Sequence, residues 1–155
     1  MLVAPAIAAM LPPHSHYVEP YCGSLSVLLA KPPSDHETVN DLDHAVVTFW
    51  RVLRDRPDEL ERLCALTPHS RVEYQAAQPL DAEDELNLAR QVFVKLTQGR
   101  SGRLLRTGWR HYVDPGGSSA AMPRYLAGYV ERIGTAAKRL QQVWVGSLRV
   151  NRVHR

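Results

Sequence analysis

The pattern of apolar and polar positions divides the chain into short and long segments, which separates candidate strands from candidate helices. His16–Glu19 has the composition of a short strand and is ended by Pro20 and Gly23, and Glu37–Asn40 is a second segment of this kind. Helical composition or spacing predicts helices around them, over residues 2–11, 24–30, 43–56 and 57–66. Strands that alternate with helices in this way predict an α/β protein with a parallel sheet.

The second half of the chain has two helical patterns on either side of a glycine-rich segment. The first pattern is predicted to begin after Asp81 as its N-cap and to end at Gly99, with an apolar stripe of Leu86, Ala89, Phe93 and Leu96. Residues 100–122 have little helical pattern and predict a loop or hairpin. A helix from Pro123 to Leu140 and a strand over residues 143–150 complete the prediction. The expected organisation is therefore 1–66, 67–122 and 123–155.

Charge is distributed unevenly between the two parts of the chain. Residues 1–90 hold 7 Lys/Arg and 14 Asp/Glu, whereas residues 91–155 hold 12 Lys/Arg and only two acids, Asp114 and Glu131. A one-sided basic region is typical of a protein with a polyanionic partner. A solvated basic surface without a partner is the alternative, and composition alone does not choose between the two.

The remaining composition excludes several classes. With 155 residues, 45% hydrophobic and 23% charged, the chain has the balance of an ordinary globular protein. No segment is long and apolar enough for a membrane span, and the apolar start lacks the basic flank of a signal peptide. Cys22 and Cys64 are expected to be core thiols, which favours a cytoplasmic protein. His14 and His16 have no partners at metal-ligand spacing, so no metal site is predicted.

The sharpest chemical signal lies where the first predicted strand ends. After Glu19 the chain passes Gly23, at which a ligand could approach the main chain, and then enters a helix whose first N–H groups favour an anion. Asp41 follows the second strand, where an acid can accept both hydroxyls of a ribose. These residues predict a ligand with a ribose and an anionic tail. A strand–turn–helix without a ligand, in which Asp41 caps a helix, is the alternative.

Two cofactors fit that outline, a dinucleotide and S-adenosylmethionine. The dinucleotide fingerprint G-x-G-x-x-G is absent, because Gly23 is the only glycine between residues 1 and 98. Glu19-Pro20-Tyr21-Cys22-Gly23 instead closely resembles the first cofactor motif of the DNA adenine methylase family. Asn40-Asp41-Leu42-Asp43 is similar to the second motif of that family. The resemblance covers about residues 2 to 150 and is strongest over 17–56.

The resemblance implies S-adenosylmethionine as cofactor and a partial Rossmann-like methyltransferase sheet. It places Glu19, Pro20, Tyr21 and Gly23 on the methionine side of the cofactor, Asp41 at the ribose hydroxyls and Leu42 near the adenine ring. Leu25 departs from the glycine that is commoner in the family at that position.

The helical, basic insert lies where the family places its target-recognition region, which implies double-stranded DNA as partner. The DNA-binding residues expected there are Arg100, Arg103, Arg106, Trp109 and Arg110. Arginine binds phosphates or guanine edges, and an aromatic ring can wedge beside an unstacked base. A flexible loop with Trp109 packed in the core is the alternative.

The catalytic Asp-Pro-Pro-Tyr motif of the family does not occur in the sequence, so no catalytic residue is assigned. Val143–Gly146 resembles the strand that precedes that motif in the family. Asp114-Pro115-Gly116-Gly117 lacks the second proline and the aromatic residue, and it is better interpreted as a turn. The aromatic–Gly-Gly-Lys segment that opens family members is also absent.

Two functions follow from these observations. The first is adenine-specific DNA methylation from S-adenosylmethionine, with this chain incomplete or inactive alone and a second polypeptide as the partner that could supply the missing half. The second is a non-catalytic DNA-binding protein derived from a methyltransferase. A nicotinamide-dependent oxidoreductase is disfavoured by the missing glycines. An open strand edge beside Glu19 also predicts self-association.

Overall fold

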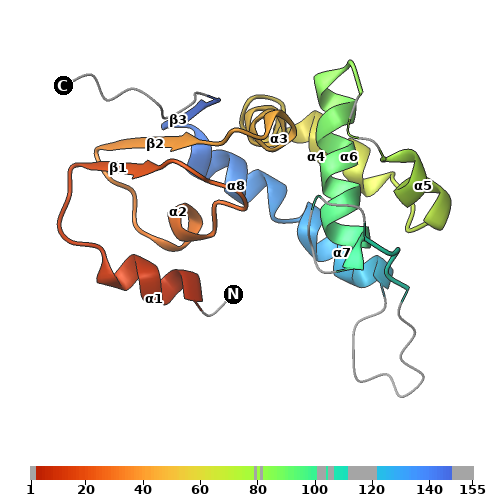
Figure 1. Ribbon diagram of the computed structural model, residues 1–155, viewed down its shortest axis with the longest axis horizontal. Helices are drawn as coiled ribbons and strands as arrows, with labels where there is room; N and C mark the ends of the chain where they lie inside the picture. The colour runs from red at the N-terminus through yellow and green to blue at the C-terminus, as the bar shows by residue number, and fades with distance from the viewer. Residues whose placement is uncertain are drawn as a thin grey trace.

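The computed structural model describes residues 3–78, 80, 82–100, 104, 107–111 and 122–147. Within these residues a small parallel sheet is combined with helices (Figure 1). The elements in chain order are α1 (Val3–Met10), β1 (His16–Glu19), α2 (Ser26–Ala30), β2 (His36–Asn40), α3 (His44–Asp55), α4 (Pro57–Ala65), α5 (Arg71–Ala76), α6 (Glu85–Gln98), α7 (Met122–Val130), α8 (Ile133–Leu140) and β3 (Val143–Gly146).

The sheet has the order β1-β2-β3, and both strand pairs are parallel. Glu19 lies opposite Val39, and Asn40 lies opposite Gly146, so the carboxyl ends of all three strands meet at one edge of the sheet. This arrangement confirms the predicted α/β class and the parallel sheet. It also places the segments that follow Glu19 and Asn40 side by side, which decides where the candidate site forms.

Only one face of the sheet is covered within the described residues. Tyr17, Glu37 and Val143 lie in register on the buried face, on the side where Figure 1 shows α1, α2 and α8. On the opposite face, Val18 and Trp144 flank Thr38 and remain 53% and 51% exposed. In the described part of the chain β1 pairs only with β2, so its other edge is open, as the sequence predicted.

The helices beyond the sheet pack around α6, which lies beside α3, α4 and α5 (Figure 1). The strong apolar stripe of α3 explains its central position, because Val47, Phe49 and Leu53 are all buried. Asp43 begins α3 by accepting hydrogen bonds from the N–H groups of Ala45 and Val46. The core is therefore continuous from the sheet to the helical part.

The predicted helix after Asp81 begins later than expected. The N-cap of α6 is Asp84, which accepts a hydrogen bond from the N–H of Asn87 at 2.8 Å. Asp81 itself lies outside the described residues. The helix is also buried around most of its circumference and not along one stripe, because α3, α4 and α5 pack on different sides of it. Leu86 and Leu96, which the predicted stripe contained, are only partly buried.

Two further predictions are corrected at helices. The single helix predicted over residues 123–140 is two helices, α7 and α8, separated by a turn at Glu131 and Arg132. Both helices pack on α4, and α8 also reaches α3 and β3. The helix α5 was not predicted, although Ser70 followed by Glu73 three residues later is a helix-start signal. The last strand is observed over Val143–Gly146, and residues 148–150 lie outside the described part.

Both cysteines are buried free thiols, as expected. Burial raises the pKa of Cys22 and of Cys64 to about 12 each. In the described residues, no helix combines the length and apolar character needed to cross a membrane.

Candidate functional site

The segments that follow β1 and β2 are joined by the Asp41 carboxylate. Its Oδ2 accepts a hydrogen bond from the N–H of Gly23 at 2.9 Å, and its Oδ1 accepts one from the N–H of Asp43 at 3.0 Å. The main chain adds a second connection, because the N–H of Cys22 donates to the carbonyl oxygen of Asn40 at 2.9 Å. The structure therefore brings Gly23 and Asp41 together at the carboxyl edge of the sheet, where ligands bind in open parallel sheets.

Gly23 has the backbone geometry that the sequence suggested. Its φ is +44°, and a β-carbon built at this position would meet no atom within 4 Å. Its carbonyl oxygen accepts a hydrogen bond from the indole Nε1 of Trp50 at 2.7 Å, which fixes the turn to α3. The turn is thus held from both sides while the space above Gly23 stays open. A ligand can therefore approach the α-carbon of Gly23 closely, although the N–H and the carbonyl oxygen of this residue are already hydrogen-bonded.

Leu25 explains the departure from glycine in the first motif. It has a φ of +52°, a conformation that favours glycine, yet its side chain is fully buried in the core. The burial of a leucine side chain contributes about 1.5–3 kcal/mol, which is enough to offset the cost of about 1–2 kcal/mol for a left-handed backbone. The turn therefore keeps the conformation of a glycine and uses the leucine for packing.

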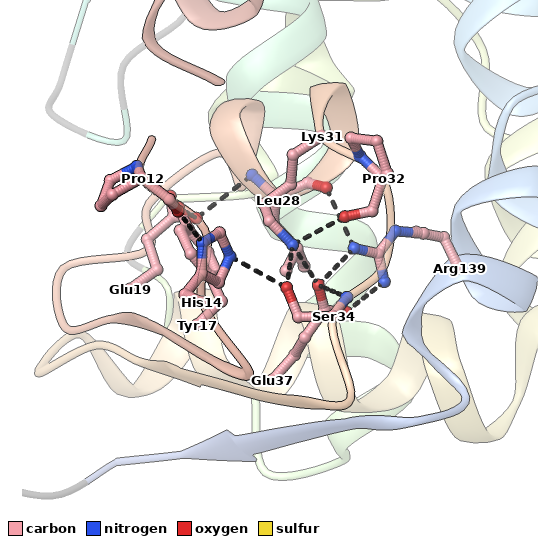
Figure 2. Close-up of polar contacts among 10 residues, drawn as sticks. All are labelled: Pro12, His14, Tyr17, Glu19, Leu28, Lys31, Pro32, Ser34, Glu37 and Arg139. Atoms are coloured by element: carbon pink, nitrogen blue, oxygen red, sulfur yellow. Dashed lines mark hydrogen bonds and ion pairs between the residues drawn. The ribbon is translucent and has the colours of Figure 1, made fainter. Parts of the chain in front are cut away.

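Glu19 is turned toward the protein interior. Its Oε2 accepts hydrogen bonds from the hydroxyl of Tyr17 at 3.0 Å and from the N–H of Leu28 in the first turn of α2 at 3.3 Å (Figure 2). Burial raises the pKa of Glu19 above its ordinary value, against these two hydrogen bonds, which lower it. In the structure Glu19 connects β1 to the start of α2 and so positions the Gly23 turn.

The other residues expected at the cofactor lie on the surface around this edge. Tyr21 is 71% exposed and Leu42 is 55% exposed, while Pro20 is partly buried. Exposed apolar side chains beside an open turn are available to a ligand with an aromatic ring. The Asp41 carboxylate has further lone pairs beyond the two hydrogen bonds it accepts. These residues fit a cofactor with a ribose and an adenine ring.

A buried ionic network fixes the elements behind this edge. Lys31, which follows α2, donates hydrogen bonds to Glu37 of β2 at 2.6 Å and to the hydroxyl of Ser34 at 2.7 Å (Figure 2). Arg139 of α8 reaches the same carboxylate with both terminal nitrogens and also donates to the carbonyl oxygen of Leu28. The side chains of Lys31 and Glu37 are each 3% exposed. The network joins α2, β2 and α8 and was not predicted.

The charges of the network depend on one another. Burial opposes ionisation of Glu37, but hydrogen bonds from Arg139, Lys31 and the N–H of Ser34 outweigh it and lower the pKa of Glu37 to about 2. The ammonium of Lys31 also lies 4.7 Å from the centroid of the Tyr17 ring. One anion thus compensates two cations behind the candidate cofactor edge.

The basic segment forms a second candidate surface at the end of α6. Gly99 and Trp109 form an antiparallel bridge, and the N–H of Arg110 donates to the carbonyl oxygen of Gln98 at 2.7 Å. This pairing agrees with the expected loop or hairpin. An open cavity of about 1040 Å³ lies between the bridge, α5 and α6. Its lining residues are Arg71, Tyr74, Gln75, Gln78, Leu80, Lys95, Arg100, Thr107, Gly108 and Trp109.

The structure places the predicted DNA-binding residues in different environments. Arg100 is exposed and lines the cavity, whereas Arg110 points inward, with its Nη2 donating to the carbonyl oxygen of Thr97 at 2.7 Å and its guanidinium over the ring of Tyr125. Trp109 is half-buried, stacked on His69 with ring centroids 4.8 Å apart. Arg103 and Arg106 lie outside the described residues, as does the Asp114-Pro115 turn.

Two cationic residues of the cavity, Arg71 and Lys95, were not singled out in the sequence. Arg71 belongs to the helix that was not predicted. Lys95 lies within the apolar pattern of α6, and a lysine at a buried helical position is the signal that could have identified it. Among the described residues, no group of His, Cys, Asp or Glu side chains is arranged to hold a metal ion.

Comparisons with known proteins identify the family of the chain. No curated protein matches the chain. A family model, D12 class N6 adenine-specific DNA methyltransferase, matches residues 2–97, a segment that includes β1, β2, the Gly23 turn and all but the last residue of α6. That match spans more than half of the 155 residues, and the chain therefore belongs to the D12 class of N6 adenine-specific DNA methyltransferases.

Proposed function

We propose that this chain binds S-adenosylmethionine at the carboxyl ends of β1 and β2 and serves methyl transfer to the adenine amino group in DNA. The observation that carries the proposal is the contact between the Gly23 turn and Asp41, which lies inside the segment matched by the family. An acid at the end of the second strand, next to a glycine turn after the first, is the arrangement by which α/β folds hold a ribose.

Each residue of the edge has a distinct part in the proposal. Asp41 accepts the two ribose hydroxyls while it continues to hold the N–H groups of Gly23 and Asp43. Gly23 leaves room for the methionine part, and Tyr21 and Leu42 offer apolar surface to the ligand. Glu19 acts indirectly, because its carboxylate accepts the hydrogen bond from Leu28 that holds the start of α2. The bound cofactor supplies the methyl group, and the chain supplies its position.

The first prediction is selective binding of S-adenosylmethionine. We expect calorimetric titration of the chain to give weak but measurable binding of S-adenosylmethionine and of its demethylated product. We expect no binding of NAD, because the turn has one glycine where a dinucleotide pyrophosphate needs several. Binding of NAD in place of S-adenosylmethionine would reject the proposal in favour of an oxidoreductase.

The second prediction concerns DNA. The basic balance of residues 91–155 motivates a proposal of salt-sensitive binding to double-stranded DNA with little sequence preference. Arg103 and Arg106 are the residues to replace first, because the guanidinium of Arg110 packs against Tyr125 and its removal would disturb the fold. Replacement of both by alanine should lower the slope of log K against log salt by about 0.9 for each phosphate that the variant no longer neutralises.

The matched control for this measurement is Arg62→Ala with Lys138→Ala. Both residues are exposed, and they lie on α4 and α8, away from the basic segment. The control removes the same net charge and should leave the slope close to that of the wild type. Equal changes of slope in the two double variants would place the DNA-binding surface elsewhere.

The open face and edge of the sheet support one further proposal about partners. Val18 and Trp144 are apolar and half exposed, and among the described residues no strand pairs with the second edge of β1. Such surfaces pair with other chains unless they are covered. We therefore propose that this part of the sheet is completed by contact with another polypeptide or by self-association.

A further inference from the structure

The cavity between α5, α6 and the Gly99–Trp109 bridge has the charge of an anion site. Three cationic residues line it, Arg71, Lys95 and Arg100, and within the part of the chain that the structure describes no aspartate or glutamate belongs to its lining. They come from three separate segments, namely the start of α5, the last turn of α6 and the bridge. Cations from separate elements that surround one space, without an acid among them, favour a ligand that carries negative charge.

Lys95 is the cation best placed to meet an anion in the cavity. It is only 6% exposed, and among the residues that the structure describes its ammonium group has no hydrogen-bond or ion-pair partner. Its Nζ does not belong to the fully buried polar atoms that lack a partner, so the stem is buried in the helical packing while the ammonium opens on the cavity. An anion that entered the cavity would give this ammonium a charge-assisted hydrogen bond.

The rest of the lining is suited to a nucleobase. Tyr74, Leu80 and Trp109 provide apolar walls, and the Tyr74 hydroxyl is fixed by hydrogen bonds to Thr107. Gln75 and Gln78 provide amide groups, which can donate to and accept from the edge of a base. A cavity of about 1040 Å³ is far larger than a phosphate needs. Cations, amides and aromatic walls together match a phosphate with its nucleoside attached.

We propose that this cavity takes one nucleotide of the DNA strand, with its phosphate at Lys95 and Arg71 and its base between the aromatic walls and the glutamine amides. The inference rests on the proposed function, because it assumes DNA as the partner of the basic segment. It adds a second recognition site to the chain, separate from the edge at Asp41. A single strand or an unpaired position would enter more readily than a paired base, because a paired base must first leave its stack and its partner.

Thymidine 5′-monophosphate is the probe that tests the proposal. It lacks both the adenine ring and the ribose 2′-hydroxyl that Asp41 would recognise. In NMR titrations of the 15N-labelled chain, we expect it to shift the amide signals of α5 and of residues 107–109. Thymidine without phosphate should bind much more weakly. Lys95→Met should weaken binding of the monophosphate about tenfold or more, because the variant cannot donate a charge-assisted hydrogen bond to the phosphate.

The matched control is Lys138→Met, which removes an exposed lysine of α8 outside the cavity. It should leave binding of the monophosphate unchanged. The melting temperature of Lys95→Met should stay close to that of the wild type, because methionine keeps an apolar stem within the packing of α6 and removes no hydrogen bond that the described residues make to the ammonium. Weaker binding together with retained stability would separate recognition from folding.

Two results would overturn the inference. One is equal affinity of wild type and Lys95→Met for thymidine 5′-monophosphate, and the other is inorganic phosphate binding as tightly as the nucleotide. S-adenosylmethionine binding, measured on the same samples, distinguishes the two claims. A protein that binds S-adenosylmethionine but not the nucleotide would reject the nucleotide site in the cavity and leave the proposed function standing. Absence of S-adenosylmethionine binding from the wild type would reject the proposed function itself.

Discussion

Glu37→Gln is expected to destabilise the chain by about 3–5 kcal/mol, the range for breaking a buried ion pair by removing one partner. The substitution keeps the shape of the side chain but leaves Lys31 and Arg139 as two cations without an anion. Total stabilities are commonly about 5–15 kcal/mol, so a domain at the lower end of this range would lose most of its free energy of unfolding. Urea unfolding followed by circular dichroism measures the change.

Glu59→Gln provides the matched control. Glu59 pairs with Arg56 at 2.7 Å, but both side chains are largely in solvent, at 55% and 41% exposed. Exposed pairs of this kind contribute little to stability, so this variant should be close to the wild type. A combined replacement of Lys31, Glu37 and Arg139 by methionine should be much more stable than Glu37→Gln, because no uncompensated charge remains. Equal stability of Glu37→Gln and Glu59→Gln would contradict the structural role of the network.

The network also predicts a dependence of stability on pH. Glu37 has a pKa of about 2 in the folded chain, below its ordinary 4.5. Its contribution is therefore fully present above pH 4.5 and is lost as the pH falls from 4.5 toward 2. The difference in stability between the wild type and Glu37→Gln should shrink across that window. A constant difference down to pH 2 would mean that another group controls the acid response.

The second large effect concerns catalysis. We expect the 155-residue polypeptide alone to transfer no methyl group to DNA, because its sequence has no Asp-Pro-Pro-Tyr motif. Incubation with labelled S-adenosylmethionine and mixed-sequence duplex DNA measures this. Addition of a polypeptide that carries the motif should produce label on adenine, and light scattering should show self-associated species of the chain giving way to a mixed complex.

Label on adenine from the chain alone would contradict this prediction. Asp114 would then be the first residue to mutate, because Asp114-Pro115 is the one Asp-Pro pair in the sequence. A polypeptide that remains monomeric without a partner would contradict self-association through the open sheet face and edge, and one that also fails to bind the added polypeptide would contradict the proposal as a whole. The two readouts are independent, since one follows chemistry and the other follows association.

The sequence predicted the elements of the sheet because their signals are local. Pro20 and Gly23 end β1, and the apolar stripe of α3 is strong, so alternating strands and helices were recognised and the parallel sheet was confirmed. Local signals were weaker where packing decides the outcome. Both α7 and α8 pack on α4, but only α8 also packs on α3 and β3, and helical spacing alone does not contain such tertiary contacts. The helix α5 has six residues, too few for a periodic pattern.

The candidate site was predicted only as far as neighbouring strands determine it. Gly23 and Asp41 meet because parallel strands align their carboxyl ends, and that follows from the fold class. The Lys31–Glu37–Arg139 network joins residues 102 positions apart and has no local signature. Lys95 is similar, because its burial depends on helices that pack around α6 from three sides.

The ribose contact of Asp41 can be separated from its part in holding the Gly23 turn. Asp41→Asn keeps the size of the side chain but removes the charge and one acceptor. Adenosine and 2′,3′-dideoxyadenosine, used as competitors of S-adenosylmethionine, report on the hydroxyls alone. Asp43→Asn is the matched control, because Asp43 caps α3 next to the site and has no proposed contact with the ribose.

Calorimetric competition with these two nucleosides tests the central claim most directly. We predict that the wild type binds adenosine at least about tenfold more tightly than 2′,3′-dideoxyadenosine, since charge-assisted hydrogen bonds contribute about 1.5–3 kcal/mol each. Asp41→Asn should show little of that preference, and Asp43→Asn should keep it. An equal preference for the hydroxyls in the wild type and in Asp41→Asn would contradict a cofactor site at the ends of β1 and β2.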